Sequence, residues 1–347
     1  MLNKRKEQKI NMKILVTGGC GFIGSHTCVE LLENGYDITI IDNLCNSKAD
    51  IVDKIKSITH KDFTFYEGDL RNKELLTTIF EQEKIDAVIH FAGLKAVNES
   101  VKKPLMYYDN NLTSTLTLLE VMEKFNCKNI VFSSSSTVYG VQECPLIESM
   151  ERKKTTNPYG ETKSVIERIM EDLYHSDPTW TITLLRYFNP VGAHESGLIG
   201  EDPNGIPNNL MPYILKVATQ ELPQLTIYGN DYPTEDGTCI RDYIHVVDLA
   251  KGHLAALNHA HNHPNNIFTY NLGSGKGISV TEIVTTFEKV NNIKLNYVYG
   301  PRREGDIPIV YADPSKALKE LNWQTTKTLE DMCKDSYHYI ISNKAQK

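Results

Sequence analysis

Three glycines near the start of the chain constrain its fold more than any other sequence feature. Gly18, Gly21 and Gly24 come directly after the β-branched run Ile14 to Thr17, where the helical segment Ile23 to Asn34 begins. In such a strand-turn-helix unit the first glycine permits a tight turn, the second lets the backbone approach a pyrophosphate, and the third lets helix and strand pack closely. The helix N-terminus attracts the phosphate charge. The spacing therefore predicts a dinucleotide-binding turn.

The next predicted strand, Ile38 to Asp42, ends in an acid. Asp42 stands near the spacing from the glycine turn at which a carboxylate accepts hydrogen bonds from the adenosine ribose hydroxyls. Its charge would repel a 2′-phosphate, and no Arg or Lys immediately follows it. We therefore expect the cofactor to be NAD rather than NADP.

Short apolar runs alternate with helical segments from Lys13 onward, which is typical of βαβ units and a parallel sheet. The predicted fold class is therefore α/β, with a Rossmann-like doubly wound parallel sheet. A long helix is predicted from about Pro104 to Phe125, and Gly35 is expected to end the first helix. The predicted strands are Ile14 to Thr17, Ile38 to Asp42, Phe63 to Glu67, Ala87 to Phe91, Ile130 to Ser133 and Ile182 to Arg186.

The alternation weakens after about Pro190, where a stretch rich in Pro, Asn and Gly runs from Gly192 to Asn209. We expect a flexible N-terminal extension at residues 1–12, an NAD-binding domain at 13–190, and at 191–347 mainly a smaller mixed α/β substrate-binding subdomain. Some segments of this last region are expected to return to the nucleotide domain. The remainder should cover the carboxyl edge of the sheet, where ligands of open parallel sheets bind.

Composition and charge exclude several other classes of protein. The net charge of −7 argues against a nucleic-acid-binding domain, which needs a concentrated positive face. No apolar run approaches the roughly 18 residues of a membrane span, and no signal peptide is recognisable. Seven cysteines occur without a CxxC pair or a zinc-finger group, so we expect reduced thiols, no metal site and a cytoplasmic protein.

Tyr159 and Lys163 are four residues apart at the start of a predicted helix. Residues at this spacing share a helix face, so the lysine ammonium can lie near the phenol and favour its ionised form. The serine run after the strand Ile130 to Ser133 offers a hydroxyl, that of Ser135, at the carboxyl end of the same sheet. Together these residues predict hydride chemistry at a secondary alcohol. The phenolate takes the hydroxyl proton, NAD takes the hydride, and Ser135 hydrogen-bonds the oxygen as it becomes a carbonyl.

With these residues identified, the chain resembles the UDP-glucose 4-epimerases, which are extended short-chain dehydrogenases/reductases. The likeness runs from about Lys13 to Trp323, and such a number of ordered blocks is highly specific. The blocks are Val16-Thr-Gly-Gly-Cys-Gly-Phe-Ile-Gly-Ser-His26, Asp42-Asn-Leu-Cys-Asn-Ser47, Phe91-Ala-Gly-Leu-Lys-Ala-Val97, Tyr159 to Lys163, Leu185 to Ala193, Pro207 to Tyr213, Thr234 to Thr238, Arg241 to His245 and Pro301 to Asp306.

The resemblance implies two sets of contacts. The implied cofactor contacts are Gly18, Gly21, Phe22, Ile23, Gly24, Asp42, Asn43, Leu44, Cys45, Asn46, Ser47, Asp69, Leu70, Phe91, Ala92, Gly93, Leu94, Lys95, Asn110, Ser135, Tyr159, Lys163 and Phe188. The implied sugar-nucleotide contacts are Lys95, Ser135, Ser136, Thr137, Tyr159, Asn189, Asn209, Leu210, Thr226, Ile227, Tyr228, Arg241, Arg303, Asp306 and Val310. Arg241 and Arg303 can supply forked hydrogen bonds to a diphosphate, whereas Arg302 is interpreted as a surface ion pair.

The resemblance also implies a mechanism and an assembly. Tyr159 and bound NAD oxidise C4 of the hexose, the 4-keto sugar rotates while UDP stays anchored, and the hydride returns to its other face. NAD should then stay bound throughout turnover. The family usually forms homodimers through a helical face, which the long helix ending at Phe125 and the segment Tyr159 to His175 could supply.

Two alternatives remain open on the residues alone. A sugar-nucleotide 4,6-dehydratase shares the fold and the Tyr-Lys pair, but typically carries Thr-Asp-Glu where this chain has Ser135, Ser136 and Thr137. Elimination of water needs that acid pair. A non-catalytic NAD-binding regulator is the other alternative, although it would readily lose the tyrosine that this chain retains.

Substrate range is predicted from one position, four residues after Asp306. Some family members carry a bulky tyrosine there, against the C2 substituent of the sugar, whereas this chain has Val310. A smaller side chain should leave room for an N-acetyl group. We therefore expect UDP-N-acetylglucosamine and UDP-N-acetylgalactosamine to be interconverted as well.

Overall fold

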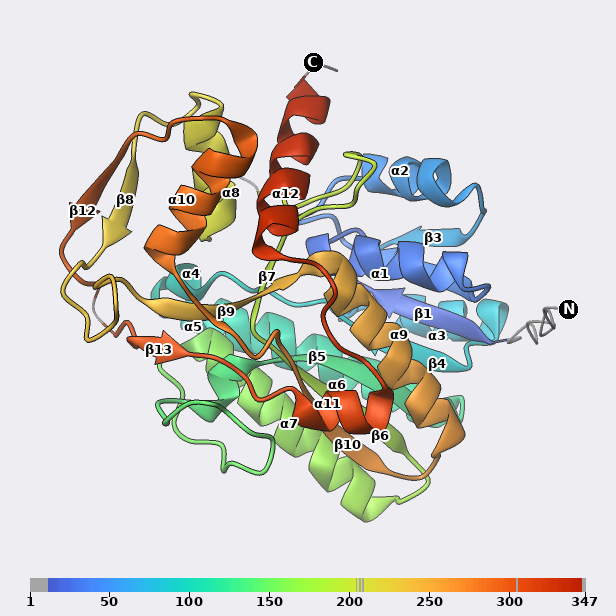
Figure 1. Cartoon of the computed structure of the whole chain (residues 1–347). Coiled ribbons are helices and arrows are strands. Elements are labelled where there is room, and N and C mark those ends of the chain that lie inside the picture. Colours follow the sequence, from blue (N-terminus) through green and yellow to red (C-terminus); the bar gives the residue numbers. More distant parts are fainter. Residues whose placement is uncertain (1–11, 204, 206, 208, 304, 345–347) are drawn as a thin grey trace, which may run out of the picture.

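The computed structural model describes residues 12–203, 205, 207, 209–303 and 305–344, so the predicted N-terminal extension lies outside it except for Met12. Within these residues the central sheet has seven parallel strands in the order β10-β6-β5-β4-β1-β2-β3 (Figure 1). This is the predicted doubly wound arrangement. The strands are β1 (Lys13–Thr17), β2 (Asp37–Asp42), β3 (Thr64–Glu67), β4 (Ala87–His90), β5 (Asn129–Ser135), β6 (Thr181–Tyr187) and β10 (Ile267–Leu272).

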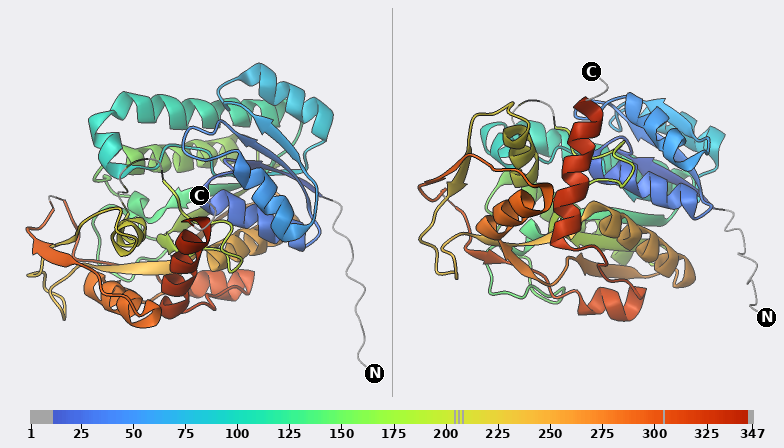
Figure 2. Two further views of the ribbon diagram at one scale, coloured as in Figure 1. Left: turned by 90° about the horizontal axis from the view of Figure 1, so that it is seen from above. Right: turned by 45° about the horizontal axis from the view of Figure 1, so that its top comes forward.

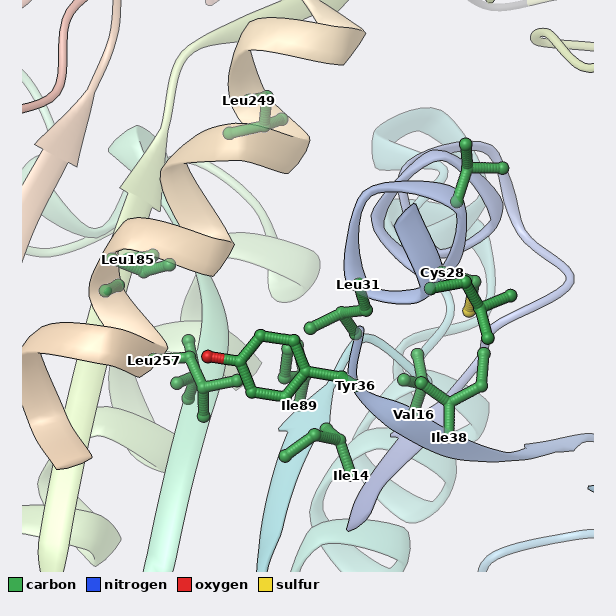
Figure 3. Close-up of a cluster of buried hydrophobic side chains, with 14 of the residues drawn as sticks. Ile14, Val16, Cys28, Leu31, Tyr36, Ile38, Ile89, Leu185, Leu249 and Leu257 are labelled. Carbon is green, nitrogen blue, oxygen red and sulfur yellow. The ribbon is translucent and has the colours of Figure 1, made fainter. Parts of the chain in front are cut away.

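Helices cover both faces of this sheet because successive strand residues point to opposite sides. Ile14 and Val16 pack toward one face, and Leu15 packs toward the other. The first face, part of which Figure 3 shows, is covered by α1 (Phe22–Glu33), α2 (Asp50–Thr59), α9 (Val246–Asn262) and α11 (Ser315–Leu321). The second face is covered by α3 (Lys73–Glu83), α6 (Ser114–Lys124) and α7 (Pro158–Ser176).

The predicted strands and first helix are confirmed to within two residues at their ends, and Gly35 follows α1 with φ +84°. The long helix predicted from Pro104 to Phe125 is instead divided into α5 (Pro104–Tyr108), a π-helical turn (Asp109–Thr113) and α6. An apolar pattern alone does not reveal such a turn. Short π-helical insertions are frequent at functional sites. A further short helix, α4 (Val97–Lys102), precedes α5.

The second half of the chain contributes to two regions. One strand of this half, β10, pairs with β6 at one edge of the central sheet. Helices α9 and α11 of this half cover the central sheet, and its other elements form a separate core with small sheets, packed around residues such as Ile214, Tyr243 and Phe287. Its elements are β7 (Asn189–Val191), α8 (Leu210–Ala218), β8 (Leu225–Tyr228), β9 (Ile240–His245), β11 (Gly277–Ser279), α10 (Val280–Asn291), β12 (Tyr297–Gly300), β13 (Ile309–Val310) and α12 (Leu329–Lys344). The exact domain boundary stays a prediction.

Two features of the fold define where a ligand can bind. β1 pairs with β2 on one side and with β4 on the other, so the chain reverses direction across the sheet beside β1. Ligands bind at the carboxyl ends of the strands near such a reversal. Figures 1 and 2 show α12 between the α8–α10 pair and the α1–α2 pair.

Among the helices of the described residues, none has the length and apolar character that crossing a membrane requires.

Candidate active site

A cavity of about 830 Å³ opens at the carboxyl ends of β1, β2, β3 and β4. Its walls include most of the residues predicted to bind the cofactor: Gly18, Gly21, Phe22, Ile23, Gly24, Asp42, Asn43, Cys45, Asn46, Ser47, Asp69, Leu70, Phe91, Ala92, Gly93, Leu94, Lys95, Asn110, Tyr159 and Lys163. The predicted residues Leu44, Ser135 and Phe188 are not among the lining residues. The volume lies within the range of ordinary cofactor pockets.

The glycine turn that opens α1 has the geometry that its sequence predicts. Gly18 has φ +70°, a conformation that side chains rarely tolerate. A Cβ atom on Gly24 would lie 2.3 Å from the carbonyl oxygen of Gly18, so only glycine permits this contact between helix and turn. The backbone N–H groups at the start of α1 thus remain close to the cavity, where they attract a phosphate.

Asp42 organises the adjoining wall. Its Oδ2 atom accepts a hydrogen bond from the N–H of Cys20 at 3.0 Å, and its Oδ1 atom accepts from the N–H of Leu44 and the hydroxyl of Ser47, both at 2.9 Å. Leu44 has φ +56°, and its side chain anchors this loop by packing against the hydrophobic core. The carboxylate therefore stands between the glycine turn and the loop after β2, where it can meet a ribose.

Asp69 and the π-helical turn form another part of the cavity wall. Arg71 donates to both carboxylate oxygens of Asp69 and lowers its pKa to about 2, so this carboxylate is ionised at neutral pH. In the π-helical turn Asn110 lines the cavity. Its neighbour Asn111 accepts from the N–H of Leu94 at 2.8 Å and donates to the hydroxyl of Thr162 at 3.1 Å. The turn thus joins the loop after β4 to α7.

Tyr159 is held at the start of α7 by local signals. The side chain of Asn157 caps the helix by accepting from the N–H of Gly160 at 2.9 Å, and Pro158 occupies the first helical position. Ser135 is the last residue of β5, and its hydroxyl accepts from that of Thr137 at 3.0 Å. Burial raises the pKa of Tyr159, and the hydrogen bond with Ser135 lowers it. The two predicted catalytic hydroxyls therefore meet beside the cavity.

Lys163 extends from the same helix into the sheet. Its Nζ atom donates to the carbonyl oxygen of Ser133 at 2.6 Å and lies 4.7 Å from the centre of the Phe132 ring. Burial lowers the pKa of Lys163 to about 7, and the nearby carboxylate of Glu167 opposes this shift. The ammonium of Lys163 is therefore only partly populated near neutral pH.

Most of the predicted sugar-nucleotide residues lie outside this cavity. Of that set, Lys95 and Tyr159 line it. Ser136 and Thr137 are in a 3-10 turn (Ser136–Tyr139) after β5, and Asn189 begins β7. The rest lie on the substrate-side sheets and loops: Asn209 and Leu210 at the start of α8, Thr226, Ile227 and Tyr228 in β8, Arg241 in β9, Arg303 and Asp306 in the loop after β12, and Val310 in β13.

The charged residues among them are paired with one another. Arg303 donates from Nε to Asp306 at 2.9 Å, and Nη2 of Arg241 lies 3.8 Å from the same carboxylate. Arg303 also lies over the Tyr228 ring at 5.2 Å. Arg302, in contrast, pairs with Asp231 at 2.7 Å, which confirms the predicted surface ion pair.

Val310 links the substrate-side sheets with the end of β5 that carries Ser135. It pairs in register with Arg241 and packs against the small apolar cluster that contains Phe188. That cluster also contains Val138 of the turn after Ser135. Val310 is therefore close both to a predicted substrate arginine and to the catalytic end of β5.

Several cavity residues escaped the sequence predictions. Gly200, Glu201, Asp202 and Pro203, here called the strap, line the cavity together with Tyr187 and with the α12 residues Tyr339, Ile340, Asn343 and Lys344. Glu201 accepts from Lys95 at 3.1 Å and from Asn209 at 2.9 Å, and Asp202 pairs with Lys48. The acids of the strap and the lysines that follow β2 and β4 are complementary in charge. No local sequence pattern indicates that pairing.

Comparison with known proteins agrees with this geometry. The chain matches the family model described as GDP-mannose 4,6 dehydratase over residues 15–336. It is 57% identical over 332 residues to a Bacillus subtilis protein named UDP-glucose 4-epimerase, which covers 96% of this chain and 98% of that relative. A Pasteurella multocida protein of the same name is 55% identical, with the same shares covered. Dehydratase and epimerase are thus both represented, and the curated relatives of high identity carry the second name.

Solved structures agree with the curated relatives. A UDP-glucose 4-epimerase from Bifidobacterium longum in complex with NAD+ and UDP has a TM-score of 0.93 and 53% identity, covering 96% of this chain and 99% of that one. One from Stenotrophomonas maltophila with bound NAD and formylated UDP-arabinopyranose has a TM-score of 0.95 and 45% identity, covering 97% and 100%. Fold, site geometry and identity along nearly the whole chain lead to one conclusion: the chain belongs to the UDP-glucose 4-epimerase family.

Proposed function

We propose that this protein interconverts UDP-glucose and UDP-galactose while NAD stays bound. The observation that carries the proposal is the group formed by Tyr159, Ser135 and Lys163 at the carboxyl end of β5, beside the 830 Å³ cavity. This is the arrangement that acid-base chemistry at a secondary alcohol requires. The names of the relatives at 50–57% identity support this reaction rather than another alcohol oxidation.

The cavity fits NAD. The close contact at Gly24 leaves the start of α1 open to a pyrophosphate, and the ordered carboxylate of Asp42 suits an unphosphorylated ribose. Asn110, Tyr159 and Lys163 all line this cavity. When bound there, NAD supplies an acceptor for the C4 hydride of the hexose and a donor that returns it.

Tyr159 acts as the acid and base in this proposal. Its oxygen takes the proton of the C4 hydroxyl and later gives a proton back to the opposite face of the ring. Ser135 donates a hydrogen bond to the sugar oxygen as it becomes a carbonyl. Burial raises the pKa of Tyr159 and the hydrogen bond with Ser135 lowers it, and a positive charge on Lys163 of the same helix is proposed to favour the phenolate further.

Arg241 and Arg303 are proposed to hold the diphosphate. Both guanidinium groups contact the single carboxylate of Asp306, and Arg303 is half exposed, so both can turn toward a stronger anion. Anchoring through UDP leaves the hexose itself loosely held. That combination permits the sugar to rotate between the two hydride transfers.

Substrate range is proposed to include the N-acetylated pair. Val310 packs against the cluster that contains Val138 and Phe188, and pairs in register with Arg241. A valine there occupies less space than a tyrosine, and that space suits an N-acetyl group at C2. This part of the proposal is separable from the reaction at C4.

A cytoplasmic homodimer completes the proposal. Apolar side chains are exposed on the successive helices α4, α5 and α6: Val101 on α4, Leu105 on α5 at 83% exposure, and Leu116 on α6. Such a face is commonly covered by a second copy. The buried free thiols of Cys20, Cys28, Cys127 and Cys333 suit a reducing compartment.

Dehydration of a sugar nucleotide is not favoured. The turn from Ser136 to Tyr139 carries hydroxyl groups at the positions where a dehydratase needs its acid pair. Elimination of water requires a group that can donate a proton to the leaving hydroxyl. The presence of Tyr159 and Lys163 similarly disfavours a non-catalytic regulator.

One incubation tests the proposal. Purified protein is mixed with UDP-galactose without added cofactor, the products are separated by chromatography, and the protein is extracted for NAD. We expect UDP-glucose to form and the extract to contain NAD, with Tyr159→Phe as the matched inactive control. Absence of conversion even after NAD is supplied would contradict the assignment and favour other sugar nucleotides.

A further inference from the structure

A buried carboxylate lies one helical turn beyond Lys163. The side chain of Glu167 is 0% exposed, and it accepts hydrogen bonds from Nε and Nη2 of Arg186 at 3.0 and 2.7 Å. Arg152 donates to it at 3.0 Å, and the hydroxyl of Ser134 donates to Oε1. Glu167 thus connects α7 with β5, with β6 and with the loop that precedes α7.

The end of β5 is tied to α7 by three consecutive residues. The carbonyl of Ser133 accepts from Lys163, the hydroxyl of Ser134 donates to Glu167, and the hydroxyl of Ser135 is hydrogen-bonded with Tyr159. Neither Ser134 nor Glu167 is a predicted catalytic residue, so their hydrogen bond joins β5 and α7 independently of the catalytic group. It fixes the helix relative to the strand at the point where both catalytic hydroxyls meet.

The surroundings of Lys163 show which group supports its charge. On β5 it faces the Phe132 ring and the Ser133 carbonyl, and on β4 it faces His90, whose pKa burial lowers to about 3. His90 is therefore neutral at pH 7. On α7 itself, Glu167 is the neighbouring anion and acts against the effect of burial on Lys163.

Stability alone does not account for this arrangement. Replacing buried ion clusters with apolar residues of similar volume is often neutral or stabilising. A carboxylate kept in the interior beside a buried lysine of the site needs another reason. We propose that Glu167 is a positioning residue for the proposed epimerisation: it fixes the end of β5 through Ser134 and places a buried negative charge one helical turn from Lys163, which favours the charged form of that lysine. This inference rests on the proposed function.

The test compares the pH dependence of kcat in two neighbouring variants of the holoenzyme. Glu167→Gln keeps the shape and an acceptor oxygen but removes the charge. Lys163 should then lose its proton at lower pH, so the alkaline limb of the profile should move down by about one pH unit, with kcat about tenfold lower at pH 8. Glu171→Gln removes a carboxylate that also pairs with Arg152, two turns from Lys163, and should leave the limb unchanged.

Ser134→Ala separates the two parts of the inference. It removes the tie to β5 but keeps the charge of Glu167, so kcat should fall while the alkaline limb stays in place. If Glu167→Gln does not fold, Glu167→Gln/Arg186→Met is compared with Arg186→Met, so that the two proteins differ only in the charge of Glu167.

Three outcomes overturn the inference: an unmoved limb in folded protein that lacks the Glu167 charge, an equal shift in Glu171→Gln, or an unchanged kcat in Ser134→Ala. Absence of conversion in the unsubstituted protein would instead contradict the proposed function itself.

Discussion

The cavity at the carboxyl edge of the sheet and the substrate-side sheets are built in different ways. Around the cavity, Gly24 and Asp42 are fixed by contacts within one strand-turn-helix unit and the loop beside it. On the substrate side, Arg303 and Asp306 pair within the loop after β12, and Arg241 of β9 lies 3.8 Å from the same carboxylate. The first region is therefore preformed by backbone geometry. The second is held by exchangeable ion pairs, which an anionic substrate can replace.

This difference between the two regions suits a reaction in which NAD stays bound and the sugar nucleotide is exchanged. A preformed cavity loses little conformational entropy on binding and can hold its ligand tightly. Arg303 is half exposed, and an ion pair with an exposed partner contributes little to stability, so exchanging its partner costs little. Substitutions in the two regions should therefore affect different measurements.

The largest effect should come from Tyr159→Phe. Removing the phenol oxygen takes away the acid and base without touching the glycine turn, so kcat should fall by about a thousandfold or more. NAD extracted from the protein should remain at the level of the unsubstituted chain. Loss of NAD together with activity would show that the two regions are not independent in the way described.

Arg303→Met should raise KM for UDP-galactose by about 10- to 100-fold, because one charge-assisted contact with the diphosphate is lost. Its neighbour provides a matched control, since Arg302 is similarly exposed but pairs with Asp231 and lies over Tyr232. Arg302→Met should leave KM within about twofold. Steady-state kinetics with both variants checks this, and equal effects would contradict the assignment of the diphosphate to Arg303.

Val310→Tyr should separate the two substrate pairs. The larger side chain should reduce conversion of UDP-N-acetylgalactosamine by about tenfold or more, while UDP-galactose is still converted. The quantity to compare is kcat/KM for each substrate. Activity that is confined to the plain hexoses in the unsubstituted protein, and is unchanged in Val310→Tyr, would remove the predicted N-acetyl activity.

The smallest effect concerns how the free energy of unfolding changes at acidic pH. Burial lowers the pKa of His26 and His90 to about 3 and that of His253 to about 4. The unfolded chain takes up these protons near pH 6.5, so their contribution to stability is present above that pH and is lost as pH falls toward 4. Each histidine should contribute about 1.4 kcal/mol per pH unit to the slope of the free energy of unfolding against pH.

His253→Asn and His253→Gln should each reduce that slope by the contribution of one group. Urea unfolding between pH 6.5 and 4.5 measures the difference. An unchanged slope in both variants would show that His253 is protonated in the folded protein.

The sequence was sufficient for the parts of the site that depend on local geometry. The glycine turn, the acid at the end of β2 and the Tyr-Lys pair each lie within one strand-helix unit, and all of them border the cavity. The resemblance to the epimerases added the residues on the loops after β3 and β4. The parallel direction of the strands follows from the βα alternation, since parallel neighbours require such crossovers.

Other features depend on contacts between distant segments and had no local signal. The strap meets Lys48 and Lys95, which are about 100 to 150 positions earlier in the chain. The π-helical turn was hidden in an apolar pattern that a regular helix also satisfies. Glu167 looked like an ordinary helical acid, because its burial depends on arginines from β6 and a preceding loop.

The position of α12 has a consequence for how the protein is made. Tyr339, Asn343 and Lys344 form part of the cavity wall, and so does Gly18, more than 300 positions earlier. A growing chain that already contains the glycine turn therefore still lacks one side of the pocket. Full retention of the dinucleotide must await the final helix, so a ribosome-bound or prematurely terminated chain should exchange NAD freely even when its parallel sheet is largely assembled.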